Sequence, residues 1–159
     1  MTQADFYDVL DEFNDCMLLT FTGDGTPHAR PMGIARRDGS TLWFISGRDS
    51  AKIDELTGNR TAVITAQDSR RWLAATGTAS TSDDQTKIDQ LWSPPMAAWF
   101  PDGPDDSDLV AISVDLSDGE YWDVSGGKLV RFGIGVAKSM ATGTEIHSDE
   151  EGDHGRVGL

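Results

Sequence analysis

The sequence of 159 residues is long enough for one domain with a substantial buried core. Hydrophobic residues make up 38% of it and charged residues 25%, which is typical of a soluble globular domain, and no apolar run approaches the roughly 20 residues of a membrane span. The formal net charge of -14 would repel a phosphate backbone, so we expect no nucleic-acid partner. An N-terminus without an apolar signal core favours a cytoplasmic protein.

The predicted elements begin with a helix capped by Thr2, whose apolar face carries Phe6, Val9, Leu10 and Phe13. Further helices are predicted at about residues 50–56, 84–92 and 136–140. Runs of β-formers between turn residues predict strands at residues 16–22, 28–36, 41–46, 61–66, 72–79, 109–116, 120–123 and 128–132. Glycine-containing turns at residues 23–26, 38–39 and 125–127 are typical of hairpins.

The number and spacing of these strands predict a mainly β fold. Short strands joined by hairpins, with peripheral helices, favour an antiparallel β-barrel that is closed or partly closed, and the helices are too few for a parallel sheet. We expect a single domain over residues 1–159, whose acidic tail from about residue 143 is ordered only by contact with another element. The single cysteine, Cys16, excludes an intramolecular disulfide and is interpreted as a small buried side chain, and no metal site is expected.

The most informative stretch for function runs from Arg30 to Lys52. Pro31 within a strand predicts an edge or a bulge, where a ligand can approach. If the turn at residues 38–39 pairs the strands on either side of it, Arg30 lies beside the strand-to-helix turn that carries Ser50 and Lys52. The Ser50 hydroxyl, the first N–H groups of the helix and the positive charges of Arg30 and Lys52 would together suit a phosphomonoester. Each residue alone is as well explained as a surface residue, but together, in a chain with only 13 Lys and Arg, they favour a phosphate site.

The chain contains five tryptophans, which is a high number for its length. Their spacing favours core positions for Trp43 and Trp92. For Trp72, Trp99 and Trp122, near strand ends or loops, it leaves open whether they pack in the core or wall a planar heterocycle. The sequence has no Rossmann glycine motif, no Walker lysine and no Gly-x-Ser-x-Gly elbow.

Five segments in this order resemble the general stress protein branch of the pyridoxamine 5′-phosphate oxidase-like flavoproteins. They are residues 28–32 (His-Ala-Arg-Pro-Met), 42–52 (Leu-Trp-Phe-Ile-Ser-Gly-Arg-Asp-Ser-Ala-Lys), 77–79 (Gly-Thr-Ala), 99–103 (Trp-Phe-Pro-Asp-Gly) and 120–123 (Glu-Tyr-Trp-Asp). The resemblance covers nearly the whole chain. It implies an antiparallel split β-barrel of the FMN-binding type, assembled as a homodimer with two FMN sites at the subunit interface.

The resemblance also assigns roles to residues. Arg30 and Lys52, with Ser50, would hold the flavin phosphate. The residues implied to flank or approach the flavin ring are Arg30, Pro31, Met32, Gly33, Ile45 and Ser46 of one subunit and Trp72, Trp99 and Trp122 of the other. FMN is the expected cofactor, ahead of FAD and of the deazaflavin F420.

Departures from the oxidase pattern bear on the reaction. Ala51 stands where the oxidases have an arginine, Ala35 stands where they have a substrate lysine, and residues 128–131 lack the histidine of their substrate element. We therefore expect a flavoprotein that does not oxidise pyridoxamine phosphate. A redox protein of unknown substrate, with a small-molecule partner such as NAD(P)H, is the leading hypothesis. A non-catalytic, stress-protective flavin binder and an F420-dependent reductase are the alternatives, and the sequence identifies no catalytic base.

Overall fold

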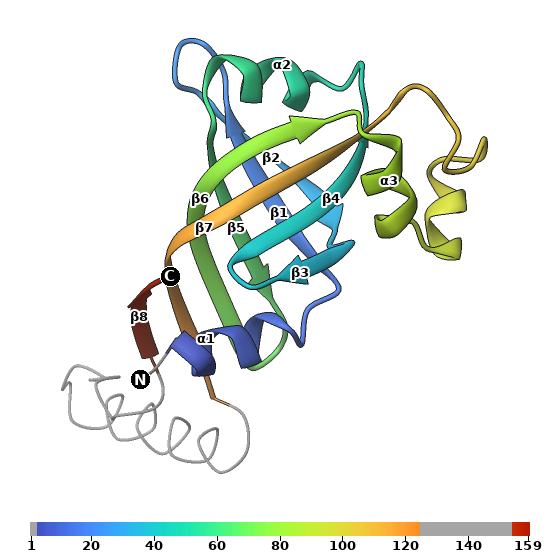
Figure 1. The fold of residues 1–159 in the computed structure, drawn as a ribbon. Helices are drawn as coiled ribbons and strands as arrows, with labels where there is room; N and C mark the ends of the chain where they lie inside the picture. The colour runs from blue at the N-terminus through green and yellow to red at the C-terminus, as the bar shows by residue number, and fades with distance from the viewer. Residues whose placement is uncertain (1–2, 125–153) are drawn as a thin grey trace, which may run out of the picture.

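The computed structural model describes residues 3–124 and 154–159 (Figure 1). The strand predicted at residues 128–132, the helix at 136–140 and most of the acidic tail lie outside the described residues. Among the residues that are described, no helix is long and apolar enough to cross a membrane. The elements in chain order are α1 (Gln3–Leu10), β1 (Asp15–Phe21), β2 (Pro27–Gly33), β3 (Arg36–Asp38), β4 (Thr41–Gly47), α2 (Ala51–Gly58), β5 (Thr61–Gln67), β6 (Arg71–Ser82), α3 (Gln85–Leu91), the 3-10 helix η1 (Pro94–Ala98), β7 (Leu109–Asp123) and β8 (His154–Gly158).

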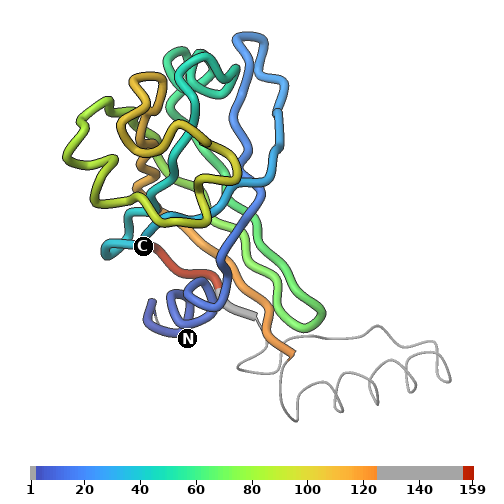
Figure 2. Tube along the Cα trace, turned by 90° about the vertical axis from the view of Figure 1, so that its right-hand side faces the viewer, coloured from blue at the N-terminus to red at the C-terminus, as the bar shows by residue number. Residues whose placement is uncertain are grey.

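The strands form one antiparallel sheet in the order β2-β1-β5-β6-β7-β4-β3, with β8 added to the side of β7. This sheet curls on itself, so that β2 contacts β4 although they are far apart in the strand order (Figures 1 and 2). Figures 1 and 2 show α2 at one end of the curled sheet and α1 with β8 at the other. The predicted fold class is confirmed: the chain is an antiparallel split barrel with peripheral helices.

The strand predicted at residues 28–36 is two strands, and this part of the prediction was wrong. The Ile34 N–H donates to the Asn14 carbonyl at 2.9 Å, and the Ala35 N–H donates to the Trp43 carbonyl at 2.8 Å. The backbone therefore bonds beside β1 at Ile34 and to β4 at Ala35, the next residue. As a result, β2 and β3 lie at opposite ends of the strand order. The turn at Gly39, whose φ is 61°, joins β3 to β4 and does not involve the strand of Arg30.

The strands predicted at 109–116 and 120–123 are a single long strand, β7. Its pairing with β6 shifts by one residue, because Thr76 faces Asp118 while Gly77 faces Leu116, and Ser117 is left as the extra residue of a β-bulge. The Ser117 hydroxyl donates to the Thr76 carbonyl at 3.2 Å. Glycine is required at position 77, since a Cβ there would overlap the backbone carbonyl of Asp115.

The core fills the inside of the curled sheet, with α1 and α2 packed at its two ends. The Phe6 ring of α1 is fully buried and occupies the space that a side chain at Gly119 would need. Burial of a side chain of this size contributes about 2–3 kcal/mol. Cys16 belongs to the same core, and burial raises the pKa of its thiol to about 12, as expected of an inert cysteine. A second cluster under α3 contains Ile45, Ile88, Leu91, Leu109 and Ala111, with Trp43 and Trp92 half-buried against it.

Candidate functional site

The residues predicted to bind a phosphate meet where β4 leads into α2. The Lys52 Nζ donates to the hydroxyls of Ser46 at 2.9 Å and Ser50 at 2.5 Å. Ser50 is the extended N-cap residue of α2, but its side chain caps no backbone N–H. The α2 amides that lack a helical acceptor therefore lie in the same turn as this lysine and two hydroxyl groups. Such a set of donors suits an anion.

Arg30 reaches the same region from β2. Both the burial of Lys52 and the positive charge of Arg30 lower the pKa of this lysine, while the nearby carboxylate of Glu55 opposes that effect. The Arg30 guanidinium donates to Glu55 at 3.1 Å, and Glu55 lies one turn after Lys52 on α2, so the two cations lie on either side of one carboxylate. The structure thus brings Arg30, Ser50 and Lys52 together as predicted, although by a different route. The curl of the sheet does this, because β2 pairs with β1 and not with β4.

Glu55, which the sequence analysis missed, lies at the centre of this cluster. Its carboxylate accepts hydrogen bonds from the Thr20 hydroxyl, from the Arg30 guanidinium at 3.1 Å and from the His28 Nδ1 at 2.7 Å. The Arg30 guanidinium also donates to the Thr20 hydroxyl at 2.5 Å. Burial raises the pKa of Glu55, but these hydrogen bonds outweigh it and lower that pKa to about 2. A signal was present, since Glu55 follows Lys52 at the i,i+3 spacing that puts two side chains on one helix face.

The register of β1 and β2 explains why these side chains converge. Thr20 faces His28, and Leu18 faces Arg30, so all four point to the same side of the sheet. Leu18 and Thr20 are fully buried, which shows that this side is the inside of the barrel. Arg30 therefore enters the mouth of the barrel, where its side chain is 21% exposed and Glu55 is 9% exposed.

The residues predicted to flank a flavin ring lie on two strands that are in contact. Pro31, Met32 and Gly33 follow Arg30 on β2, which ends the strand order, so the edge predicted from Pro31 is confirmed. Ile45 and Ser46 lie on β4, both buried, beside Ala111 and Val110 of β7. The contact between β2 and β4 brings the two groups to one region of the molecule.

The three tryptophans lie elsewhere in this chain. Trp72 faces Trp122 across β6 and β7, next to Arg71, whose guanidinium lies 3.2 Å from the Glu12 carboxylate just after α1. Figure 1 shows α1 at the end of the sheet opposite α2. Trp72 is 39% exposed, and Trp99, which follows η1, is 83% exposed. Within one chain, none of them joins the cluster of Arg30 and Lys52.

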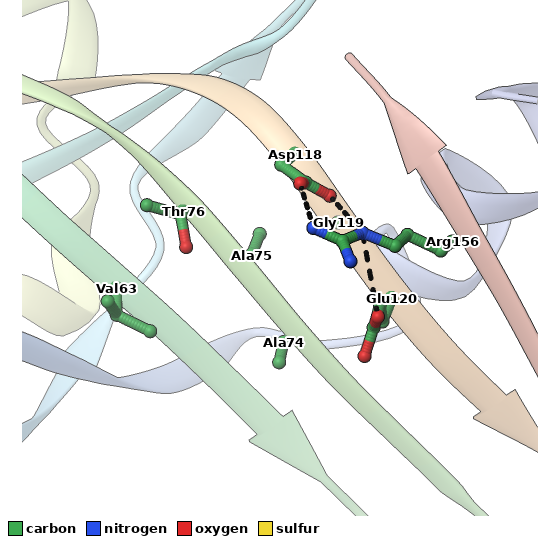
Figure 3. Close-up of a pocket in the computed structure, with 8 residues that line it drawn as sticks. All are labelled: Val63, Ala74, Ala75, Thr76, Asp118, Gly119, Glu120 and Arg156. Atoms are coloured by element: carbon green, nitrogen blue, oxygen red, sulfur yellow. Dashed lines mark hydrogen bonds and ion pairs between the residues drawn. The ribbon is translucent and has the colours of Figure 1, made fainter.

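A shallow pocket of about 230 Å³ lies on β5, β6, β7 and β8 (Figure 3). Its cation is Arg156, which donates to Asp118 at 2.8 Å and lies 3.7 Å from Glu120. The other lining residues are Val63, Ala74, Ala75, Thr76 and Gly119. Since both carboxylates already neutralise Arg156, this pocket is a poorer phosphate site than the cluster at α2.

Comparison with protein families gives one match that spans most of the chain. Residues 2–147 match the family described as pyridoxamine 5′-phosphate oxidase like. No curated protein matches the sequence.

Solved structures agree with the family match. A general stress protein 26 from a Jannaschia species is similar with a TM-score of 0.72 and 25% identity, over 98% of this chain and 97% of that one. The general stress FMN/FAD binding protein of Xanthomonas citri is similar with a TM-score of 0.66 and 25% identity, over 78% of this chain and 89% of that one. A pyridoxamine 5′-phosphate oxidase-related, FMN binding protein of Nostoc punctiforme shares the fold, with a TM-score of 0.59 and 17% identity over 78% of this chain and 84% of that one.

Proposed function

This chain belongs to the pyridoxamine 5′-phosphate oxidase-like family, in its general stress protein branch, and from that premise we propose that it is a flavoprotein that binds FMN. One observation carries the proposal: Lys52, two serine hydroxyls and the Arg30 guanidinium converge beside an edge strand at the mouth of the barrel. Similar proteins whose names include FMN or FMN/FAD binding support the choice of a flavin.

The residues fit the phosphate end of such a cofactor by their chemistry. Lys52 already points its ammonium at Ser46 and Ser50, so a phosphate oxygen entering there meets a cation, hydroxyl donors and helix amides together. Among the described residues, Arg30 donates two of its five N–H groups, to Thr20 and Glu55, and the other three are available to a ligand. The backbone of Pro31 to Gly33 and of Ile45 and Ser46 would flank the ring. When bound, the flavin supplies the hydride or electron transfer, and the protein supplies orientation and charge.

We propose that a second copy of this chain completes the site. The outer face of β2, β1, β5 and β6 carries no charged side chain from residue 17 onward, in a chain with 40 charged residues (27 acidic plus 13 basic). The outward side chains there include Ala29, Pro31, Met17, Leu19, Val63, Thr65, Ala74 and Trp72. A wide uncharged sheet face suits a protein interface. Trp72 lies on this face, and the resemblance to the family implies that Trp72, Trp99 and Trp122 of the partner would approach the flavin of the first subunit.

The visible spectrum of the purified protein tests the cofactor. We expect flavin absorbance, or its appearance when FMN is added, and mass spectrometry of the released compound identifies FMN, FAD or F420. A protein that takes up none of the three would contradict the proposal. Anaerobic reduction by NAD(P)H and reoxidation by electron acceptors then separate a redox enzyme from a protein that only stores flavin.

A further inference from the structure

Glu55 adds a negative charge to a site that otherwise holds two cations and two serine hydroxyls. Its carboxylate lies one turn after Lys52 on α2 and bonds the Arg30 guanidinium directly, at 3.1 Å. The side chain is 9% exposed, and this burial raises its pKa. The hydrogen bonds from Thr20, His28 and Arg30 have a larger effect and lower the pKa to about 2. The carboxylate is therefore ionised whenever the protein is folded near neutral pH.

The charges of Arg30, Lys52 and Glu55 add up to one net positive charge. The phosphate of FMN is a monoester that carries nearly two negative charges above its second pKa of about 6. Each phosphate of FAD has one ester bond and one anhydride bond to the other phosphate, so each carries a single charge. A site with one positive charge neutralises either FAD phosphate, but it leaves a surplus negative charge next to a buried carboxylate when FMN binds. At low effective dielectric, such a surplus is costly.

We propose that Glu55 is a specificity-determining residue that weakens the preference of this site for a doubly charged phosphomonoester over a singly charged phosphate of a pyrophosphate, and so sets the ratio of FMN to FAD affinity. This inference rests on the proposed flavin function. The position of Glu55 supports it: the carboxylate acts on both cations at once, by direct contact with Arg30 and through its field on Lys52.

Glu55→Gln tests the inference, because it removes the charge and keeps the size and a hydrogen-bond acceptor. Dissociation constants for riboflavin, FMN and FAD are measured at pH 8 by quenching of flavin fluorescence. We expect the variant to bind FMN more tightly relative to FAD by about fivefold, with riboflavin unchanged. Asp54→Asn is the matched control, since it removes the same charge from an exposed position on the same helix and should leave the ratio unchanged.

Ala51→Lys provides a second variant in case Glu55→Gln does not fold. Ala51 is exposed in the first turn of α2, so a lysine there adds a cation near Lys52 without disturbing the contacts of Glu55. It should shift the FMN to FAD ratio in the same direction. If Glu55 only held Arg30 in place, Glu55→Gln would weaken FMN and FAD alike, and that result would overturn the inference. An unchanged ratio would overturn it too, while a wild-type protein that still prefers FMN to riboflavin would leave the proposed function intact. A wild-type protein that binds no flavin would remove both.

Discussion

Removal of the positive charge of Lys52 is the most direct perturbation of the proposed phosphate site. Lys52→Met keeps most of the aliphatic stem, so the packing of α2 against the barrel should survive. It deletes the ammonium that donates to Ser46 and Ser50. Burial of Lys52 and, to a smaller extent, the charge of Arg30 lower the pKa of this lysine. Its positive charge is therefore destabilised in the free protein, and a bound anion would remove that destabilisation.

The size of the effect follows from the kind of contact that is lost. A hydrogen bond to a charged group contributes about 1.5–3 kcal/mol, and each 1.4 kcal/mol is a tenfold change in affinity. We therefore expect the dissociation constant for FMN to rise by about 10- to 100-fold in Lys52→Met, measured by fluorescence titration. Riboflavin has no phosphate and should bind both proteins equally.

Lys87→Met is the matched control for this experiment. Lys87 lies on α3 with its Nζ 4.3 Å from the centre of the Trp43 ring, so its loss should reduce stability slightly and leave the FMN affinity unchanged. Equal weakening of FMN and riboflavin in Lys52→Met would mean that the lysine supports the fold and not the phosphate. An unchanged FMN affinity would refute the assignment outright.

Three further predictions concern stability and assembly. The pKa of Glu55 is lowered from 4.5 to about 2, so this residue contributes about 3 kcal/mol of stability above pH 4.5. This contribution is lost as the pH falls toward 2. Urea unfolding should show that the wild-type protein loses more stability between pH 4.5 and 2 than Glu55→Gln does. Identical pH profiles of the two proteins would contradict this role of Glu55. Gly77→Ala should lower the free energy of unfolding by about 1–3 kcal/mol because its Cβ overlaps the Asp115 carbonyl, whereas Gly58→Ala, with open space around it, should not. Met17 lies on the uncharged sheet face and is 38% exposed, so Met17→Glu should shift a dimer to monomer in light scattering, while Asp54→Lys on α2 should not. A dimer that survives Met17→Glu would contradict this interface.

The sequence predicted the described strands and helices well because their signals are local. Asp84, for example, caps α3 by accepting from the Thr86 N–H at 2.9 Å, as its place before an apolar helix face indicates. The errors arose where long-range pairing decides the structure. The break between β2 and β3 depends on Asn14 and Trp43, and the continuity of β7 depends on a bulge opposite Gly77. No local pattern encodes either.

The candidate site shows the same division. Ser50 and Lys52 are neighbours in sequence, so their cluster was predictable from the turn that contains them. The position of Arg30 was predicted correctly from an incorrect pairing of its strand, since the curl of the sheet replaces the expected hairpin. Glu55 was missed because an acidic residue on a short helix is ordinarily solvated. Its three donors, Thr20, His28 and Arg30, come from β1 and β2, so only the folded structure reveals them.

The change of backbone partner between Ile34 and Ala35 has a consequence for the order of folding. The hairpin of β1 and β2 can form early, but β4 has only the short β3 as a local neighbour and otherwise depends on β7, which starts at Leu109. Contacts of such wide sequence separation form late. A nascent chain that ends before Leu109 already contains Arg30, Ser50 and Lys52, yet it has no strand to hold β4 against β2. We therefore expect such a truncated chain to bind no flavin, so that the cofactor stabilises the finished barrel and does not nucleate it.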